Sequence, residues 1–186
     1  MAKYPQELIR ASRRLLVRRT GQRGKLPSAR IRRSISTSYY ALFHFLLEET
    51  GKRLVGSHND LRRRRHIFIR TLTHAGIKGA LDRVRGRNVD AIVEEFFRAP
   101  GSAAGLVVVP SFVQNLARAF ADAQAKRHDA DYDLNKQLSE RDASRLSRQV
   151  ERVIAAWQDA NSPADRDFKH ALCLLMALKG QLRQQG

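Results

Sequence analysis

The chain has 186 residues and a formal net charge of +17, from 35 Lys and Arg against 18 Asp and Glu. Its single cysteine, Cys173, excludes an internal disulfide and a multi-cysteine zinc site, and no apolar run reaches the roughly 18 residues of a membrane helix. The length predicts one domain over residues 1–186, and a start without the apolar segment of a signal peptide predicts a cytoplasmic protein.

A first helix is predicted over residues 4–19, ending at the loop that contains Gly21 and Gly24. Arginines occupy its other side and include the candidate nucleic-acid-binding residues Arg13 and Arg14. The expected inward residues are apolar: Leu8, Ala11, Leu15 and Leu16.

The densest apolar and aromatic stretch, residues 34–47, lies in a long second helix that is expected to begin at Ser28 and stop at Gly51. Its inward residues recur at helical spacing: Ile31, Ile35, Ser38, Leu42 and Phe45. The neighbouring positions Tyr39 and Phe43 widen this face, so we expect helices to pack against it on more than one side.

One flank of this helix carries Tyr40 and His44, four residues apart, with Ser36 one turn before them. We interpret His44 as a hydrogen-bonded core histidine, with a catalytic role as the alternative.

A third helix is expected to start at the turn around Ser57, His58 and Asn59, with Leu61, Phe68 and Leu72 facing inward. Its outer surface carries four candidate nucleic-acid-binding residues: Arg62, Arg63, Arg64 and Arg65. Four consecutive arginines point all round a helix, so at least one is expected to bury its stem or pair with a neighbour.

The helical pattern weakens over residues 76–110, where we expect a flexible insertion with one short amphipathic piece at 89–97. Residues 99–105 read as a flexible connection, and 106–109 is the one run with strand-like alternation. Helical periodicity returns over 111–126 and again after the Ser139 cap, where the expected inward residues are Ala143, Leu146, Val150, Val153 or Ile154, and Trp157. A C-terminal helix is predicted over 163–184, with four inward residues: Phe168, Leu172, Leu175 and Leu182. The fold class is therefore predicted to be all-α.

Positive charge is concentrated in the first 70 residues, which carry +14 of the +17. Such an asymmetry is typical of a protein that binds a polyanion, most often nucleic acid. An anionic membrane surface, an acidic protein partner and a merely solvated basic face are the alternatives.

Three short motifs occur in order along the chain: Ser-x-x-Tyr-Tyr-Ala-x-Phe-His at 36–44, Ser57-His58, and Arg-x-x-Ala-Asp-Tyr at 127–132. In this order the motifs resemble those of the HEPN superfamily of small helical domains, over residues 25–157. The resemblance implies an up-down bundle of four or five helices that forms a homodimer with a groove between protomers. It also implies RNA or nucleotide binding, metal-independent ribonuclease activity in many relatives, and an antitoxin or nucleotidyltransferase partner.

The ribonuclease signature of that family is Arg, a polar residue, and a His five to seven positions after the Arg. This chain supplies Arg127 and His128, and Tyr132 stands at the first position where the His belongs. The candidate catalytic residues are therefore Arg127, His128 and Tyr132, supported by Asp131, Tyr40, His44 and His58. The alternative for Arg127 is an ion pair with Asp131 at i, i+4 that fixes the end of the helix.

No cofactor and no metal are expected. Asp129, Asp131, Asp133 and Glu140 match positions 1, 3, 5 and 12 of a calcium loop, but Leu134 replaces the required glycine at position 6. The sequence therefore predicts an RNA- or nucleotide-binding protein, with or without cleavage, and leaves open a non-catalytic module whose basic face binds an acidic partner.

Overall fold

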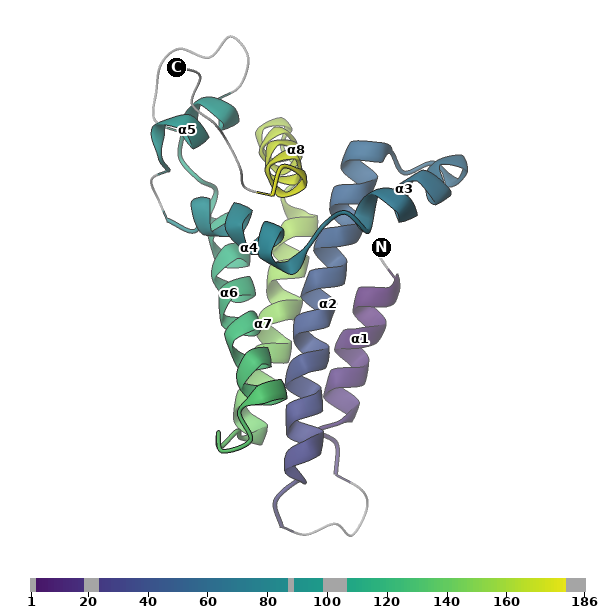
Figure 1. Ribbon diagram of the computed structural model, residues 1–186, viewed down its shortest axis with the longest axis vertical. Helices are drawn as coiled ribbons and strands as arrows, with labels where there is room; N and C mark the ends of the chain where they lie inside the picture. The colour runs from purple at the N-terminus through teal and green to yellow at the C-terminus, as the bar shows by residue number, and fades with distance from the viewer. Residues whose placement is uncertain (1–2, 19–23, 87–88, 99–106, 180–186) are drawn as a thin grey trace. The chain divides into compact units, whose positions relative to one another are not determined.

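The computed structural model describes residues 3–18, 24–86, 89–98 and 107–179 (Figure 1). Every regular element in these residues is a helix, which confirms the predicted all-α class. Residues 107–109 form no strand, whereas Leu106 and the expected flexible connection at 99–105 lie outside the described residues.

The elements follow one another along the chain as α1 (Lys3–Arg14), α2 (Ser28–Val55), the 3-10 turn η1 (Asn59–Leu61), α3 (Arg62–Ile69), α4 (His74–Arg83), α5 (Ala91–Phe97), α6 (Ser111–Tyr132), α7 (Glu140–Asp159) and α8 (Pro163–Ala177). Among the helices of these described ranges, none combines the length and apolar character that crossing a lipid bilayer would require.

The chain divides into two compact units, and we describe each by itself. Unit 1 comprises Met1–Phe45 and Ala119–Ala155, and therefore holds α1, the first part of α2, the second part of α6 and most of α7. Unit 2 comprises Leu46–Arg118 and Ala156–Gly186 and holds the rest of those helices with η1, α3, α4, α5 and α8. The single domain expected from the sequence stays a prediction.

The central helix of unit 1 is α2, as the sequence pattern predicted. Ile35, Leu42 and Phe45 have no exposed surface, and Tyr39 is 1% exposed. Ser34 is also buried, and its Oγ donates to the Ser12 carbonyl of α1 at 2.8 Å. Ser34 and Tyr39 point about 140° apart around the helix, so their burial confirms that α2 is packed on more than one face.

The inward face of α1 differs from the predicted one, and the helix ends at Arg14 rather than near residue 19. Its buried residues are Pro5, Ile9 and Ser12. Of the residues expected to face inward, Ala11 is exposed. The other three are half-buried: Leu8, Leu15 and Leu16. Ser12 faces inward because its hydroxyl shares a 3.0 Å hydrogen bond with that of Ser147 on α7, so a polar residue occupies a core position.

The second helix begins at Ser28 as predicted but does not stop at Gly51. It continues to Val55 and ends at Gly56, whose φ of +106° is the left-handed conformation that favours glycine. Gly51 lacks a side chain for another reason: a Cβ at this position would lie 2.8 Å from Ile69 Cγ2. In unit 2, therefore, Gly51 allows close packing of α3 against α2 rather than ending a helix.

The third helix is less buried than its pattern suggested. No residue of α3 is buried, Leu61 and Phe68 are half-buried, and Leu72 is buried beyond the helix end. Arg65 turns back to donate hydrogen bonds to the carbonyls of Gly56, at 2.6 Å, and His58, at 2.7 Å. This confirms that one of the four consecutive arginines pairs locally.

Residues 76–110 contain more regular structure than expected. Helix α4 starts at the Thr73 cap, whose hydroxyl accepts from Gly76 N, and it buries Ile77, Ala80 and Leu81 against its surroundings in unit 2. Helix α5 matches the short amphipathic piece predicted at 89–97. The ten residues of α4 include only a few large apolar side chains, so local periodicity was too weak to predict this helix.

The last two helices agree with their patterns. Ser139 caps α7 through reciprocal hydrogen bonds with Asp142, and Pro163 opens α8 behind the Ser162 cap. The predicted inward residues of α7 are all buried: Ala143, Leu146, Val150, Val153, Ile154 and Trp157. Phe168, Leu172 and Leu175 of α8 are buried as predicted, and the end of that predicted helix, from residue 180, lies outside the described residues.

Candidate functional site

Two polar residues of α2 and two of α6 meet in unit 1, where Figure 1 shows these helices side by side. Ser36 Oγ donates to Asp131 Oδ1, and Arg127 Nη2 donates to the Tyr40 hydroxyl at 3.2 Å. Ser36 and Tyr40 are four residues apart on α2, and Arg127 and Asp131 are four residues apart on α6. This spacing places the four side chains on the flanks where the two helices face one another. Motifs about 90 residues apart in the sequence therefore form one cluster.

Arg127 is the centre of this cluster. Its Nε lies 2.6 Å from Asp131 Oδ2, and its Nη2 also donates to the Tyr132 hydroxyl at 3.3 Å. Asp131 thus joins Ser36 through one oxygen and Arg127 through the other. The ion pair that the sequence offered as the alternative role of Arg127 does form, with side chains 24% and 29% exposed.

Three tyrosine rings surround the Arg127 guanidinium. Its central carbon lies 6.0 Å from the ring centre of Tyr39, 5.7 Å from that of Tyr40 and 5.3 Å from that of Tyr132. Desolvation by these neighbours lowers the pKa of Arg127, but Tyr40, Asp131 and Tyr132 outweigh it and raise the pKa overall. The guanidinium is therefore a fixed cation held by aromatic faces.

One nitrogen of Arg127 remains for a ligand. Nε faces Asp131 and Nη2 serves the two tyrosine hydroxyls, whereas Nη1 makes no hydrogen bond to any residue that the structure describes. A guanidinium nitrogen on a fixed side chain that is 24% exposed is a suitable donor to a phosphate oxygen.

His128 points to Tyr132 rather than joining Arg127. Its ring centre lies 5.1 Å from that of Tyr132, and the residue is exposed. Adjacent positions on a helix point about 100° apart, which explains why Arg127 and His128 do not converge on one another.

His44 is half-buried on the Tyr40 flank, as the sequence predicted. Its ring contacts Tyr4 of α1 edge-on at 5.0 Å and lies 6.5 Å from the Tyr40 ring. Burial lowers the pKa of His44, so this imidazole is neutral at neutral pH. The packing agrees with a core histidine.

Arg32 is a site residue that sequence reasoning missed. From α2 its guanidinium donates to five carbonyls at the end of α6 and in the following turn: those of Asp129, Ala130, Asp133, Leu134 and Lys136, at 2.9–3.2 Å. Two of these carbonyls also accept backbone hydrogen bonds, that of Asp129 from Asp133 N at 3.2 Å and that of Asp133 from Lys136 N at 3.3 Å. Arg32 adds charged donors to the carbonyls at the α6 terminus, where a helix leaves such groups without intrahelical partners. No local pattern in the sequence distinguishes Arg32 from the arginines around it.

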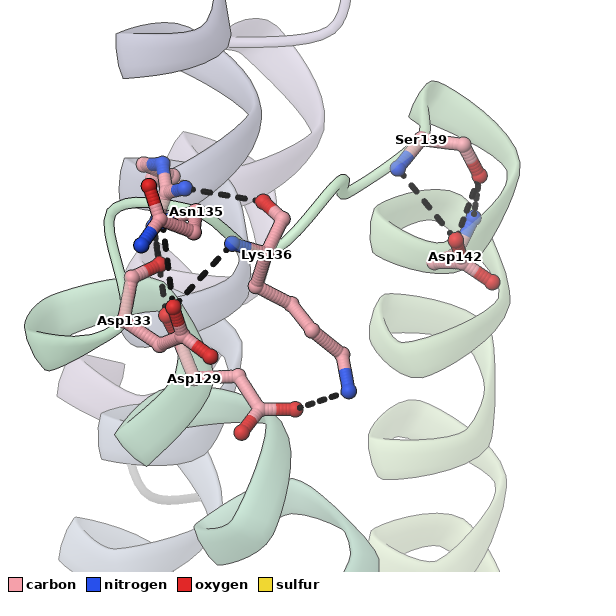
Figure 2. A network of polar contacts seen from close by, with 7 residues as sticks. Asp129, Asp133, Asn135, Lys136, Ser139 and Asp142 are labelled. Carbon is pink, nitrogen blue, oxygen red and sulfur yellow. Dashed lines mark hydrogen bonds and ion pairs between the residues drawn. The ribbon is translucent and has the colours of Figure 1, made fainter.

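Carboxylates that matched a calcium loop have other partners. Asp129 pairs with Lys136 at 3.6 Å, and Asp133 accepts from the backbone N–H groups of Asn135 and Lys136 (Figure 2). Glu140 accepts from Leu26 N at 3.0 Å. Within the described ranges, no three His, Cys, Asp or Glu side chains gather as a metal site would require.

The other predicted basic residues of unit 1 lie on α1. Arg13 forms an ion pair with Glu151 of α7, whereas Arg14 is exposed and has no ion pair with a described residue. Arg13 is thus partly neutralised and Arg14 is the more available cation.

In unit 2, the cations of α3 are exposed. Arg62, Arg63 and Arg64 have no ion pair with any described residue. Arg65 instead donates its two hydrogen bonds to backbone carbonyls. His58 is also exposed and lies 3.1 Å from Asp60. Its supporting role for Arg127 stays a prediction.

A buried lysine in unit 2 was also missed. Lys169 is 1% exposed, donates to the Ala160 carbonyl, and lies 5.3 Å from the Trp157 ring and 5.5 Å from the Phe112 ring. Nearby Cys173 is fully buried, and burial raises its pKa to about 12, so Cys173 packs as a small buried residue rather than as a reactive thiolate. A search for apolar residues at helical spacing in α8 passes over Lys169 because its side chain is charged.

Comparison with known proteins returned no matching family model, no matching curated protein and no matching solved structure.

Proposed function

We propose that this chain is a HEPN-like protein that binds RNA or a nucleotide, with Arg127 as a phosphate contact. The observation that carries the proposal is the Arg127 cluster: a cation fixed by Asp131, Tyr40 and Tyr132 that keeps Nη1 for an outside acceptor. All three family motifs are present in the sequence, and residues from two of them build this cluster.

The charge of the chain supports a polyanionic ligand. The chain carries +17, and its exposed arginines without an ion-pair partner among the described residues include Arg14 in unit 1 and Arg62, Arg63 and Arg64 in unit 2. Such cations contribute affinity that is independent of base sequence and falls as salt rises.

Cleavage is the more specific version of this proposal. A metal-independent ribonuclease of toxin–antitoxin or defence type would use Arg127 to stabilise charge on the scissile phosphate, with His128 and Tyr132 as the neighbouring polar groups. A homodimer and an antitoxin or nucleotidyltransferase partner belong to the same proposal and rest on the resemblance alone.

The alternative is a protein-interaction module whose arginines face an acidic partner. The Arg127–Asp131 ion pair favours this alternative, because a guanidinium that is already paired with a carboxylate is less available to bind a phosphate of RNA. Stoichiometric co-purification of an acidic protein that competes with RNA would support this alternative.

The test compares the wild type with Arg127→Ala and with the control Arg148→Ala, which removes an exposed positive charge elsewhere in unit 1. We expect RNA affinity to fall steeply with salt and to weaken by about 1–3 kcal/mol in Arg127→Ala, with a much smaller effect in the control. Salt-independent binding, or equal losses in both variants, would reject the Arg127 site.

A further inference from the structure

The end of α6 presents an aromatic side chain to solvent. Tyr132 is the last residue of the helix and is 63% exposed, whereas Tyr39, whose ring also lies near the Arg127 guanidinium, is 1% exposed. Large aromatic side chains gain most of their stabilisation by burial, so Tyr132 contributes little to the core of unit 1.

Tyr132 is nevertheless held in one orientation. The Arg127 guanidinium lies 5.3 Å from the ring centre and hydrogen-bonds the hydroxyl at 3.3 Å, and His128 contacts the ring at 5.1 Å. Because these three contacts already order the Tyr132 ring, the side chain loses less conformational entropy when a ligand binds to it.

The backbone beneath this ring is fixed as well. Arg32 ties the last carbonyls of α6 to α2, and Asp133 accepts from the N–H groups of Asn135 and Lys136 in the turn that follows (Figure 2). An exposed ring on an anchored helix end is a pre-organised surface rather than a side chain on a mobile loop.

Cations lie beside this surface. Arg127 Nη1 has no partner among the described residues, and Arg33 of α2 is exposed without an ion pair to any of them. Arg33 precedes Ser36 by three residues and Tyr40 by seven, which places it on the flank of α2 that faces the end of α6. An aromatic face bordered by cations is the arrangement that receives a base together with its flanking phosphates.

We propose that the Tyr132 ring is a stacking platform for an unpaired nucleobase, so that the chain prefers single-stranded nucleic acid to a duplex. The proposal rests on the proposed function and adds the ligand class and the residue that selects it. The faces of bases in a duplex are covered by their neighbours, whereas an unpaired base can leave the stack and lie on Tyr132. Duplex contacts would then be limited to phosphates.

The test measures binding of three labelled or competing probes: a short single-stranded RNA, the same sequence as a duplex, and inorganic polyphosphate. The variants are Tyr132→Ala, Tyr132→Phe and the control Tyr4→Ala, which removes another exposed tyrosine of unit 1. We expect Tyr132→Ala to weaken single-strand binding by about 10-fold and to leave the other two probes within about 2-fold. Tyr132→Phe should keep the single-strand preference, and Tyr4→Ala should match the wild type.

Equal binding of single strand and duplex by the wild type would overturn the inference, and so would an equal loss for all three probes in Tyr132→Ala. In either case the proposed function stands if Arg127→Ala still weakens binding. Absence of binding to every probe would overturn both. Melting of each variant, followed by the fluorescence of the single Trp157, shows whether a loss comes from unfolding.

Discussion

The Ser36 hydroxyl on α2 donates a hydrogen bond to Asp131 on α6, across 95 residues of sequence. The second oxygen of the same carboxylate pairs with Arg127, so Ser36 orients the group that holds the guanidinium. Ser36 therefore supports Arg127 indirectly, through the Asp131 carboxylate that both residues contact.

Replacing Ser36 should therefore loosen Asp131. In Ser36→Ala one Asp131 oxygen loses its donor, and we expect the free energy of unfolding to fall by about 1 kcal/mol. Thermal melting measures this, with Thr37→Ala as the control for helix propensity at a neighbouring hydroxyl. An equal change in both variants would show that Ser36 contributes nothing through Asp131.

Arg127→Ala separates three roles in one set of assays. If the cluster cleaves RNA, the rate should fall on the order of 10² or more while the fold is kept. If it only binds, affinity should weaken by about 1–3 kcal/mol, with no cleavage by either protein. If Arg127 merely pairs with Asp131, stability should fall by about 1 kcal/mol or less and binding should not change.

Tyr132→Phe accompanies that comparison because it removes the hydroxyl and keeps the ring. A loss of cleavage in this variant would assign the phenol a part in the reaction, since packing and stacking are unchanged. If Tyr132→Phe cleaves RNA at the wild-type rate, the role of Tyr132 is limited to the contacts of its ring.

Arg32→Gln should destabilise unit 1 although Arg32 lies among several arginines. Five carbonyls lose a charged donor, and we expect the free energy of unfolding to fall by about 1–3 kcal/mol. Arg33→Gln is the matched control, because it removes the same charge from the next, exposed position. Chemical denaturation of both variants measures the difference, and equal midpoints would contradict the role assigned to Arg32.

Lys169 should make stability depend on alkaline pH. Burial, followed by the nearby charge of Arg53, lowers the pKa of Lys169 below its ordinary value of 10.5, while Asp165, Glu49 and Cys173 oppose the shift. The folded protein therefore releases this proton at a lower pH than the unfolded chain. Between the lowered pKa and 10.5 the unfolded chain binds more protons, so stability should rise with pH in this window.

The comparison with Lys169→Met isolates this effect, because other alkaline titrations cancel between the two proteins. Relative to Lys169→Met, the wild type should gain stability as the pH rises toward 10.5. Denaturation followed by Trp157 fluorescence measures it, since Trp157 is the single tryptophan and contacts Lys169. A constant difference between the two proteins would mean that Lys169 titrates normally.

Local periodicity in the sequence was sufficient to predict most of the helices, though not α4, and several of their buried faces. The inward residues of α2 and α7 were predicted correctly because an apolar face repeats at 3.6 residues whatever it packs against. Caps such as Ser139 and Pro163 are likewise local, since each acts on the backbone of its own helix. The sequence also identified Arg127, Asp131 and Tyr132 as one group, because their spacing places them within two turns.

Tertiary structure alone decided which partner each polar group has. Gly51 resembles a helix stop in the sequence, yet its role depends on Ile69, and only packing brings Ile69 to it. Arg32 and Arg33 are equivalent as neighbours in a basic run, but Arg32, not Arg33, donates to the carbonyls at the end of α6 and in the turn that follows. A single side chain carries no information about the distant backbone that it will meet, so the sequence determined most of the helices of this protein and the fold determined the contacts that build the Arg127 cluster.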